Sequence, residues 1–184
     1  DRSRGLGDVY KRQKSHILDP LDKVDQKRPS KPQDIVLYGF GRIGRLVSRI
    51  MAQMTGPGNY YRLRAIVVRK GSDTNDLLKR ASLLRRDSVH GSFHGTIRVD
   101  NETETLVING NPVKIIYANG PKDINYSDYD IDKPIIIDNT GVWREEKDLS
   151  LHLDSGASKV VLTAPGKGQI KNIVNGINND ILNE

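Results

Sequence analysis

Three glycines early in the chain have a spacing that is typical of a phosphate-binding turn. Gly39, Gly41 and Gly44 stand in the order G-x-G-x-x-G. In such a motif the first glycine permits a tight turn, the second lets the backbone approach a pyrophosphate, and the third lets a helix pack against a strand. Amide groups at the start of that helix then face the anion. The motif alone is a weak signal, because flexible loops produce it by chance.

The segments around the glycines are those that a dinucleotide site requires. The apolar run Ile35–Tyr38 precedes them and predicts a buried strand. Residues 55–58, Thr-Gly-Pro-Gly, end the helix that follows the motif. A second apolar strand, Leu63–Val68, comes at the spacing of a βαβ unit, which places it beside the first strand. The apolar residues of the helix recur at helical spacing and are Ile43, Leu46, Val47, Ile50 and Met54.

The end of the second strand departs from the common NAD-binding pattern. A carboxylate often stands there and accepts hydrogen bonds from the adenosine ribose hydroxyls, whereas this sequence has Val68. Arg69 and Lys70 follow, and cationic side chains at this place can pair with the additional phosphate of NADP. We therefore expect NAD or NADP as the cofactor, with relaxed or NADP-leaning specificity. The alternative is that both cations are solvated and that NAD binds through its pyrophosphate.

The rest of the chain alternates between strands and helices, with one interruption. Short buried-type strands are predicted at 135–138 and 160–163, with a helix at about 144–154 between them. This alternation implies a parallel sheet. Segments with a period of two interrupt it and predict antiparallel strands, the last two joined by an Asn-Gly-Asn turn; they are 96–99, 105–108 and 113–116. The fold class is α/β: a Rossmann-type, doubly wound, mainly parallel sheet with an antiparallel excursion.

Several segments, in order, resemble the glyceraldehyde-3-phosphate dehydrogenase family. The likeness covers about residues 34–180, and motifs found together in this order are far more specific than the glycines alone. VNGIN at 174–178 resembles the strand that leads toward the family's nucleophile. The other segments are LYGFGRIGRL at 37–46, RRDSVHGSFHGTIRV at 85–99, LVINGNPVKI at 106–115, DNTGVW at 138–143 and KVVLTAPGKG at 159–168.

The resemblance implies further residues that contact the cofactor. Arg42 and Ile43 match the positions whose backbone meets the pyrophosphate. Asn119 stands where the family commonly has a basic residue near the adenine, which puts that contact in doubt. Thr163–Pro165 are weaker candidates at a later strand end, where a simple turn is an equal alternative. Asn139, Thr140 and Gly141 match the strand end that faces the nicotinamide, although such residues could instead cap the next helix.

The resemblance also implies an activity for the complete protein. A cysteine attacks an aldehyde with help from a histidine, hydride passes to NAD(P), and phosphate releases the acyl group as an acyl phosphate. Neither catalytic residue is carried over, and the sequence contains no cysteine. We therefore expect a truncated piece that lacks the catalytic domain and is inactive alone, with a sugar-phosphate substrate and homo-oligomers only in the full-length protein. The alternatives are another Rossmann aldehyde dehydrogenase, such as a semialdehyde dehydrogenase, and a non-catalytic NAD(P)-binding module.

The first 33 residues differ in character from the rest. They are rich in Lys, Arg, Asp, Ser and Pro and predict a disordered tail and linker, with the folded domain at 34–184. Residues 1–13 resemble a translated sequencing-adapter remnant. Residues 1–33 carry nine basic and five acidic side chains, so most of the net charge of +6 belongs to the tail. The folded part is therefore not expected to bind nucleic acid.

Other candidate sites have plainer explanations. His90 and His94 could form a metal pair, but the glycines beside them favour a turn. Arg80, Arg85 and Arg86 are expected on the solvated side of a helix whose leucines pack inward. No apolar run is long enough to cross a bilayer and no secretory signal opens the chain, so we expect a cytoplasmic protein without membrane contact.

Overall fold

A computed structural model describes residues 31–56, 59–71 and 74–182 of the chain. The chain divides into two units, Asp1–Pro32 and Gln33–Glu184, and the second contains every element described below. The predicted disordered tail lies outside the described residues, apart from its last three. The first strand begins at Gln33, one residue before the expected start of the folded domain.

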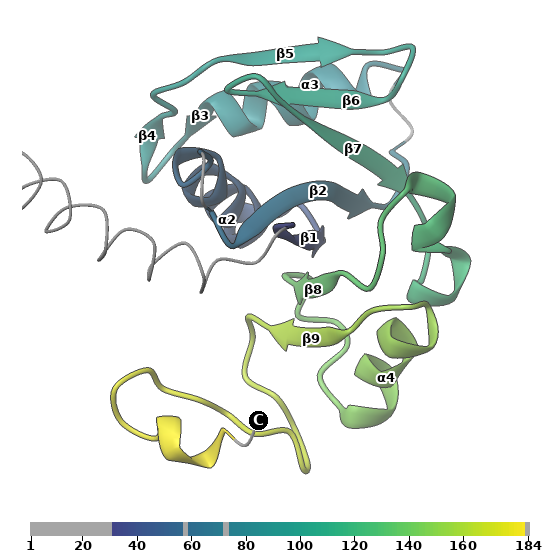
Figure 1. Ribbon diagram of the computed structural model, residues 1–184. Coiled ribbons are helices and arrows are strands. Elements are labelled where there is room, and N and C mark those ends of the chain that lie inside the picture. Colours follow the sequence, from purple (N-terminus) through teal and green to yellow (C-terminus); the bar gives the residue numbers. More distant parts are fainter. Residues whose placement is uncertain (1–30, 57–58, 72–73, 183–184) are drawn as a thin grey trace, which may run out of the picture. The chain divides into compact units, whose positions relative to one another are not determined.

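A seven-stranded sheet forms the centre of this unit, in the order β5-β6-β7-β2-β1-β8-β9 (Figure 1). In this spatial order, the neighbouring strands β7, β2, β1, β8 and β9 pair in parallel. Strands β5, β6 and β7 pair antiparallel. This arrangement confirms the mainly parallel sheet with an antiparallel excursion. The bounds are β1 Gln33–Tyr38, β2 Tyr61–Val68, β5 Ile97–Asp100, β6 Thr105–Ile108, β7 Asn111–Tyr117, β8 Ile135–Asp138 and β9 Lys159–Leu162.

Helices lie on both faces of the sheet, so alternate residues of β1 enter different cores. Ile35 and Leu37 pack in a cluster with apolar residues of two helices, α2 (Arg42–Gln53) and α3 (Asp76–Arg85). Val36 packs in a second cluster with residues of the segment between β7 and β8.

The remaining elements are the β3–β4 hairpin (Arg86–Asp87 and Gly91–Ser92), α4 (Glu146–Asp154) and three short 3-10 helices, η1 (Pro121–Asp123), η2 (Tyr126–Tyr129) and η3 (Asn179–Ile181).

Local sequence explains the hairpin between β6 and β7. Asn109 and Gly110 both have positive φ angles, 49° and 83°, as a two-residue type I′ turn requires. Ile108 pairs with Asn111 directly across this turn. The predicted turn is therefore confirmed.

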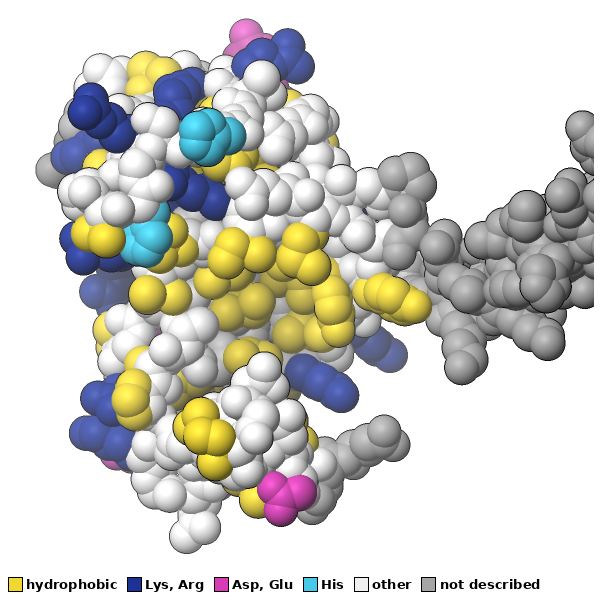
Figure 2. Space-filling model, turned by 90° about the vertical axis from the view of Figure 1, so that its left-hand side faces the viewer, with side chains coloured by type: hydrophobic (Ala, Val, Ile, Leu, Met, Phe, Trp, Pro, Cys, Tyr) yellow, Lys and Arg dark blue, Asp and Glu magenta, His cyan; other side chains and the backbone are white. Residues whose placement is uncertain are grey.

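Helix α2 does not bury the face that its apolar spacing suggests. Its buried residues are Gly44, Ser48, Arg49 and Ala52, whereas Ile50 is 54% exposed. Gly44 is buried because the helix starts in close approach to the Gly39 carbonyl, and partly buried Val47 and Met51 pack against the core beside the buried residues. Hydrophobic side chains gather across the middle of one face of the molecule (Figure 2). The exposed apolar residues of α2 are Ile43, Ile50 and Met54.

Two expectations near the end of the chain are wrong. Strand β9 is not buried, because it pairs only with β8 at the sheet edge and Val161 is 51% exposed. Residues 174–178 form a turn rather than a strand. The Asn178 side chain accepts a hydrogen bond from the Val174 amide at 2.7 Å, and this local bond closes the turn where no neighbouring strand pairs with it among the described residues. None of the described helices is long and apolar enough to cross a membrane.

Candidate dinucleotide site

A crevice of about 330 Å3 opens where strands β1, β2, β7 and β8 end. This is the edge of a parallel sheet at which ligands bind in doubly wound folds, and the volume suits part of a dinucleotide. Of the predicted site residues, Gly39, Gly41, Val68, Arg69 and Thr140 line it. The other lining residues were not predicted from the sequence as part of a site; they are Tyr38, Phe40, Val67, Arg80, Ala118, Val142 and Trp143.

Two of the three motif glycines are required by close approach. Gly39 has a φ of 93°, and a Cβ atom there would lie 2.8 Å from the Thr140 methyl group. A Cβ atom on Gly44 would lie 2.3 Å from the Gly39 carbonyl oxygen. Any side chain at either position would therefore force the strand–helix turn open.

Gly41 has the opposite surroundings. No atom lies within 4 Å of the place where its Cβ would stand. Gly41 is also the N-cap of α2, with no side-chain cap and no acidic residue in the first turn. Among the hydrogen bonds of the described residues, none uses the amide groups of Arg42, Ile43 or Gly44. The turn is thus open, with free donors at the positive end of a helix dipole, as an anion site requires.

The predicted loop after β8 forms the opposite wall. The Asp138 carboxylate accepts hydrogen bonds from both the amide and the hydroxyl of Thr140, each at 2.7 Å. Gly141 has a φ of 65°, so the chain turns sharply there. Asn139 donates to the Ile137 carbonyl at 3.0 Å, and its own side-chain oxygen is buried without a partner. These residues do not cap the next helix, because α4 has Glu145 as its N-cap.

Comparison with known proteins identifies the family. Residues 33–146 match the family model described as "Glyceraldehyde 3-phosphate dehydrogenase, NAD binding domain". The chain belongs to this family. It is 60% identical over 146 residues to a glyceraldehyde-3-phosphate dehydrogenase-like protein of Pseudomonas aeruginosa (strain UCBPP-PA14), covering 79% of this chain and 32% of that protein.

Two further relatives are less similar to this chain. The glyceraldehyde-3-phosphate dehydrogenase from Thermotoga maritima is 36% identical over 148 residues, which is 80% of this chain and 41% of that protein. The one from P. aeruginosa strain PAO1 is 34% identical over 148 residues, again 80% and 41%. The chain thus spans about a third to two fifths of the length of these curated relatives.

Within this NAD-binding domain, two arginines line the crevice near the end of β2. Val68 is buried there and supplies no acceptor for ribose hydroxyls. Of the residues that the structure describes, Arg69 and Arg80 are the charged ones that line the crevice. Arg80 reaches it from α3, bound to the Asp76 carboxylate at 2.6 Å and to the Arg69 carbonyl at 2.9 Å. Lys70 instead places its ammonium group over the Tyr117 ring, 5.6 Å from the centroid.

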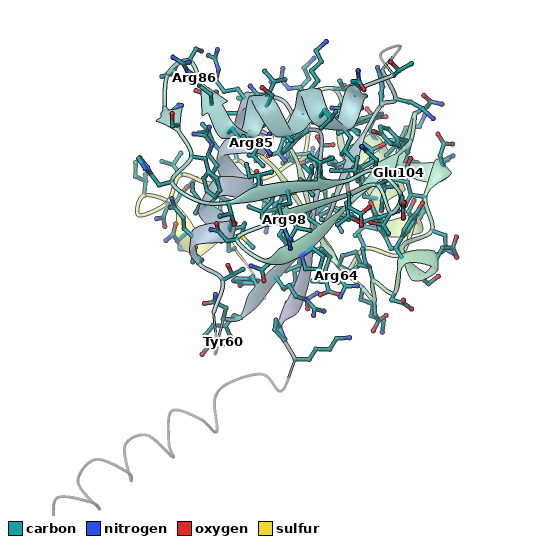
Figure 3. All side chains as sticks on the ribbon, turned by 90° about the horizontal axis from the view of Figure 1, so that it is seen from above. Tyr60, Arg64, Arg85, Arg86, Arg98 and Glu104 are labelled. Carbon is teal, nitrogen blue, oxygen red and sulfur yellow. The ribbon has the colours of Figure 1, made fainter. Side chains whose placement is uncertain are left out.

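The expectation for Arg80 is wrong. Its side chain is only 18% exposed, because it stands three residues after Leu77 and four before Leu84, on the face of α3 that packs inward. The spacing of Arg80 from Leu77 and Leu84 was the sequence signal that could have placed it on the inward face of α3. Arg85 and Arg86 are exposed, as expected, and lie at the end of α3 (Figure 3).

The remaining candidates lie beside the crevice rather than in its lining. Ala118 lines it, while the next residue, Asn119, is exposed and donates its amide to Asp123 at 3.2 Å. The Thr163 amide and hydroxyl both donate to the Asp138 carbonyl. The Pro165 carbonyl accepts from Arg144 at 2.7 Å. His90 lies in the predicted turn, with Nδ1 3.1 Å from the Asp87 carboxylate.

An aromatic wall completes the site. The rings of Tyr38 and Trp143 meet edge to face with centroids 5.5 Å apart, and both line the crevice. Burial, followed by the charge of Asp138, holds the pKa of the Tyr38 hydroxyl above its usual range. The phenol therefore stays neutral at physiological pH. Such a wall offers apolar area for a flat ring system.

Proposed function

We propose that this chain is the dinucleotide-binding part of a phosphorylating, glyceraldehyde-3-phosphate dehydrogenase-like oxidoreductase. The observation that carries the proposal is the open glycine turn, in which Gly39 and Gly41 line a crevice at the strand ends and the unbonded amides stand directly after them, at the start of α2. The family match supports NAD binding at this domain.

The residues fit a dinucleotide along the length of the crevice. The amides of Arg42 and Ile43 would donate to the pyrophosphate, and the bare Gly41 would let it approach. Arg69 would lie at the adenosine ribose and Thr140 at the nicotinamide. The bound dinucleotide would supply the hydride acceptor. The chain's own groups bind and orient it.

The complete reaction belongs to the whole protein. The sequence contains no cysteine, so a thiol nucleophile of the family's kind must lie outside these 184 residues. We therefore expect this chain to bind dinucleotide without oxidising an aldehyde, and the whole protein to be cytoplasmic and oligomeric. The test is formation of reduced cofactor by the whole protein with glyceraldehyde 3-phosphate. Strict dependence on inorganic phosphate is expected, and turnover without phosphate would contradict the phosphorylating reaction.

We further propose that NADP binds at least as tightly as NAD. Two arginines and, among the described residues, no carboxylate line the crevice at the end of β2, and a charge-assisted bond from Arg69 to the additional phosphate strengthens binding. Dissociation constants of the full chain for both cofactors test this. Arg69→Met should weaken NADP binding roughly tenfold and leave NAD nearly unchanged.

Lys70→Met is the matched control for this prediction. It removes the same charge one residue further on, from a side chain that lies over Tyr117, so its effect on NADP binding should stay below about threefold. A wild-type chain that binds NAD at least tenfold more tightly than NADP would contradict the proposed cofactor preference.

A further inference from the structure

A buried histidine lies behind the crevice, in a place to which neither the sequence motifs nor the proposed function assign a role. His152 is on α4, and its Nε2 atom is 3.2 Å from an Asp138 carboxylate oxygen. Neither side chain exposes any surface. In the tautomer that carries its proton on Nε2, His152 donates a hydrogen bond to this carboxylate oxygen. Its other ring nitrogen is buried without a partner, so the bond to Asp138 is the polar contact that orients the ring.

The contact continues through Asp138 into the crevice. The other carboxylate oxygen of Asp138 accepts hydrogen bonds from the amide and the hydroxyl of Thr140. The Thr140 hydroxyl in turn accepts a hydrogen bond from the Val142 amide at 3.1 Å. Thr140 and Val142 both line the crevice. The Thr140 methyl group stands directly against Gly39 of the phosphate-binding turn. One carboxylate therefore holds the loop on one side and His152 on the other.

The His152 ring also supports the aromatic wall. Its centroid is 4.7 Å from that of Tyr38 and 6.4 Å from that of Trp143, edge to face in both cases. Among the described residues, His152 makes the only hydrogen bond found to the Oδ2 oxygen of Asp138, because Thr140 uses Oδ1. A buried carboxylate that loses a donor must turn toward another one or admit water. Either change would release the Thr140 loop.

We propose that His152 is a positioning residue for the nicotinamide end of the dinucleotide. It acts through Asp138, whose carboxylate it keeps aimed at the Thr140 loop. This inference rests on the proposed function, because it assumes that Thr140 faces the nicotinamide. Its effect should be greatest at this end of the ligand, because neither the hydrogen bond nor the ring contacts of His152 reach Gly41 or Arg69.

The experiment compares two ligands on the full chain by calorimetry. NAD+ contains the nicotinamide, and ADP-ribose lacks it but keeps the adenosine and the pyrophosphate. His152→Leu removes the donor, while His152→Gln keeps an N–H group near the place of Nε2. His94→Leu makes the same change at an exposed histidine. We expect His152→Leu to weaken NAD+ binding roughly tenfold and ADP-ribose binding less than twofold, with His152→Gln and His94→Leu near wild type.

Any other outcome would contradict either the positioning role of His152 or the proposed function. Equal weakening of both ligands by His152→Leu, or no weakening of either, would overturn the positioning role. If His152→Leu does not fold, His152→Phe is the second variant: it keeps a ring beside Tyr38 and Trp143 but removes the Nε2 donor, and it should again weaken NAD+ binding more than ADP-ribose binding. A wild-type chain that binds neither ligand would overturn the proposed function itself, and the role of His152 with it.

Discussion

At the scale of single residues, two glycines of one motif have opposite surroundings. Gly44 is in contact with the Gly39 carbonyl, so its lack of a side chain serves the fold. Gly41 faces open space, so its lack of a side chain serves no contact within the chain. The same residue type thus has a packing role at one position and a ligand role at the other.

This difference predicts opposite results for two alanine substitutions. Gly44→Ala should lower the free energy of unfolding by about 1–3 kcal/mol, because its Cβ would clash with backbone that cannot yield. Gly41→Ala should change stability by less than about 1 kcal/mol, because its φ of −71° suits alanine. It should nevertheless weaken NAD+ binding at least about tenfold. Urea unfolding and calorimetry measure the two effects. NAD+ binding unchanged by Gly41→Ala would contradict the phosphate-binding turn.

At the scale of elements, a buried arginine joins the two helices on one face of the sheet. Arg49 of α2 donates twice to the Leu84 carbonyl in the last turn of α3, at 2.9 and 2.7 Å, and once to the Gly91 carbonyl at 3.1 Å. Its guanidinium also lies over the Phe93 ring. The cation therefore caps the negative end of α3, where carbonyl groups have no helical partner.

We expect Arg49→Met to lower the free energy of unfolding by roughly 2–4 kcal/mol, because it leaves buried carbonyl groups unpaired. Arg86→Met removes the same charge at an exposed position just beyond α3 and should cost less than about 0.5 kcal/mol. Urea unfolding of both variants gives the comparison. Equal stability of the two would show that Arg49 does not hold the helices together.

The β3–β4 hairpin contains a carboxylate that should make stability depend on pH. Asp87 accepts hydrogen bonds from the amides of His90 and Val89, each at 3.0 Å, and from the His90 ring. These bonds, the His90 amide foremost, hold the pKa of Asp87 below its usual range. Its stabilising effect is therefore present above the unfolded-state pKa of about 3.9 and is lost as the pH falls toward the lower folded-state value.

Asp87→Asn should flatten this loss on the acid side. The melting temperature of the wild-type chain should fall more steeply below pH 4 than that of the variant, because only the wild type must protonate a bonded carboxylate. Asp154→Asn, at an exposed carboxylate, is the control and should keep the wild-type slope. Circular dichroism melts across the acid range measure the slopes. Parallel curves for all three proteins would contradict the assignment.

At the scale of the whole molecule, stability is concentrated at the centre of the sheet. Val36 of β1 exposes no surface and lies between two neighbouring strands, whereas Val161 of β9 is at the sheet edge. Val36→Ala should cost about 1–3 kcal/mol, and Val161→Ala less than about 0.5 kcal/mol. Urea unfolding tests the pair. Similar losses would mean that β9 has a buried neighbour in solution.

Local sequence was sufficient for most elements of the fold and for part of the crevice lining. The glycine motif, the apolar runs and the Asn-Gly turn each act through neighbours in the chain, so their spacing alone predicts strand, turn and helix. The Thr140 loop was also predicted, because it follows a strand whose end lies at the same edge as the glycines. In all these cases the deciding contacts are short in sequence or follow from strand direction.

The remaining features depended on contacts between distant segments. Helical spacing shows which residues share a face, but not which face meets the sheet, and the small residues of α2 rather than its isoleucines were selected. Arg80 lies in the crevice because of the phase at which α3 packs. His152 meets Asp138 only because α4 folds back beside β8. A buried polar contact stabilises a fold only after packing has excluded water, and packing is a property of the assembled layers.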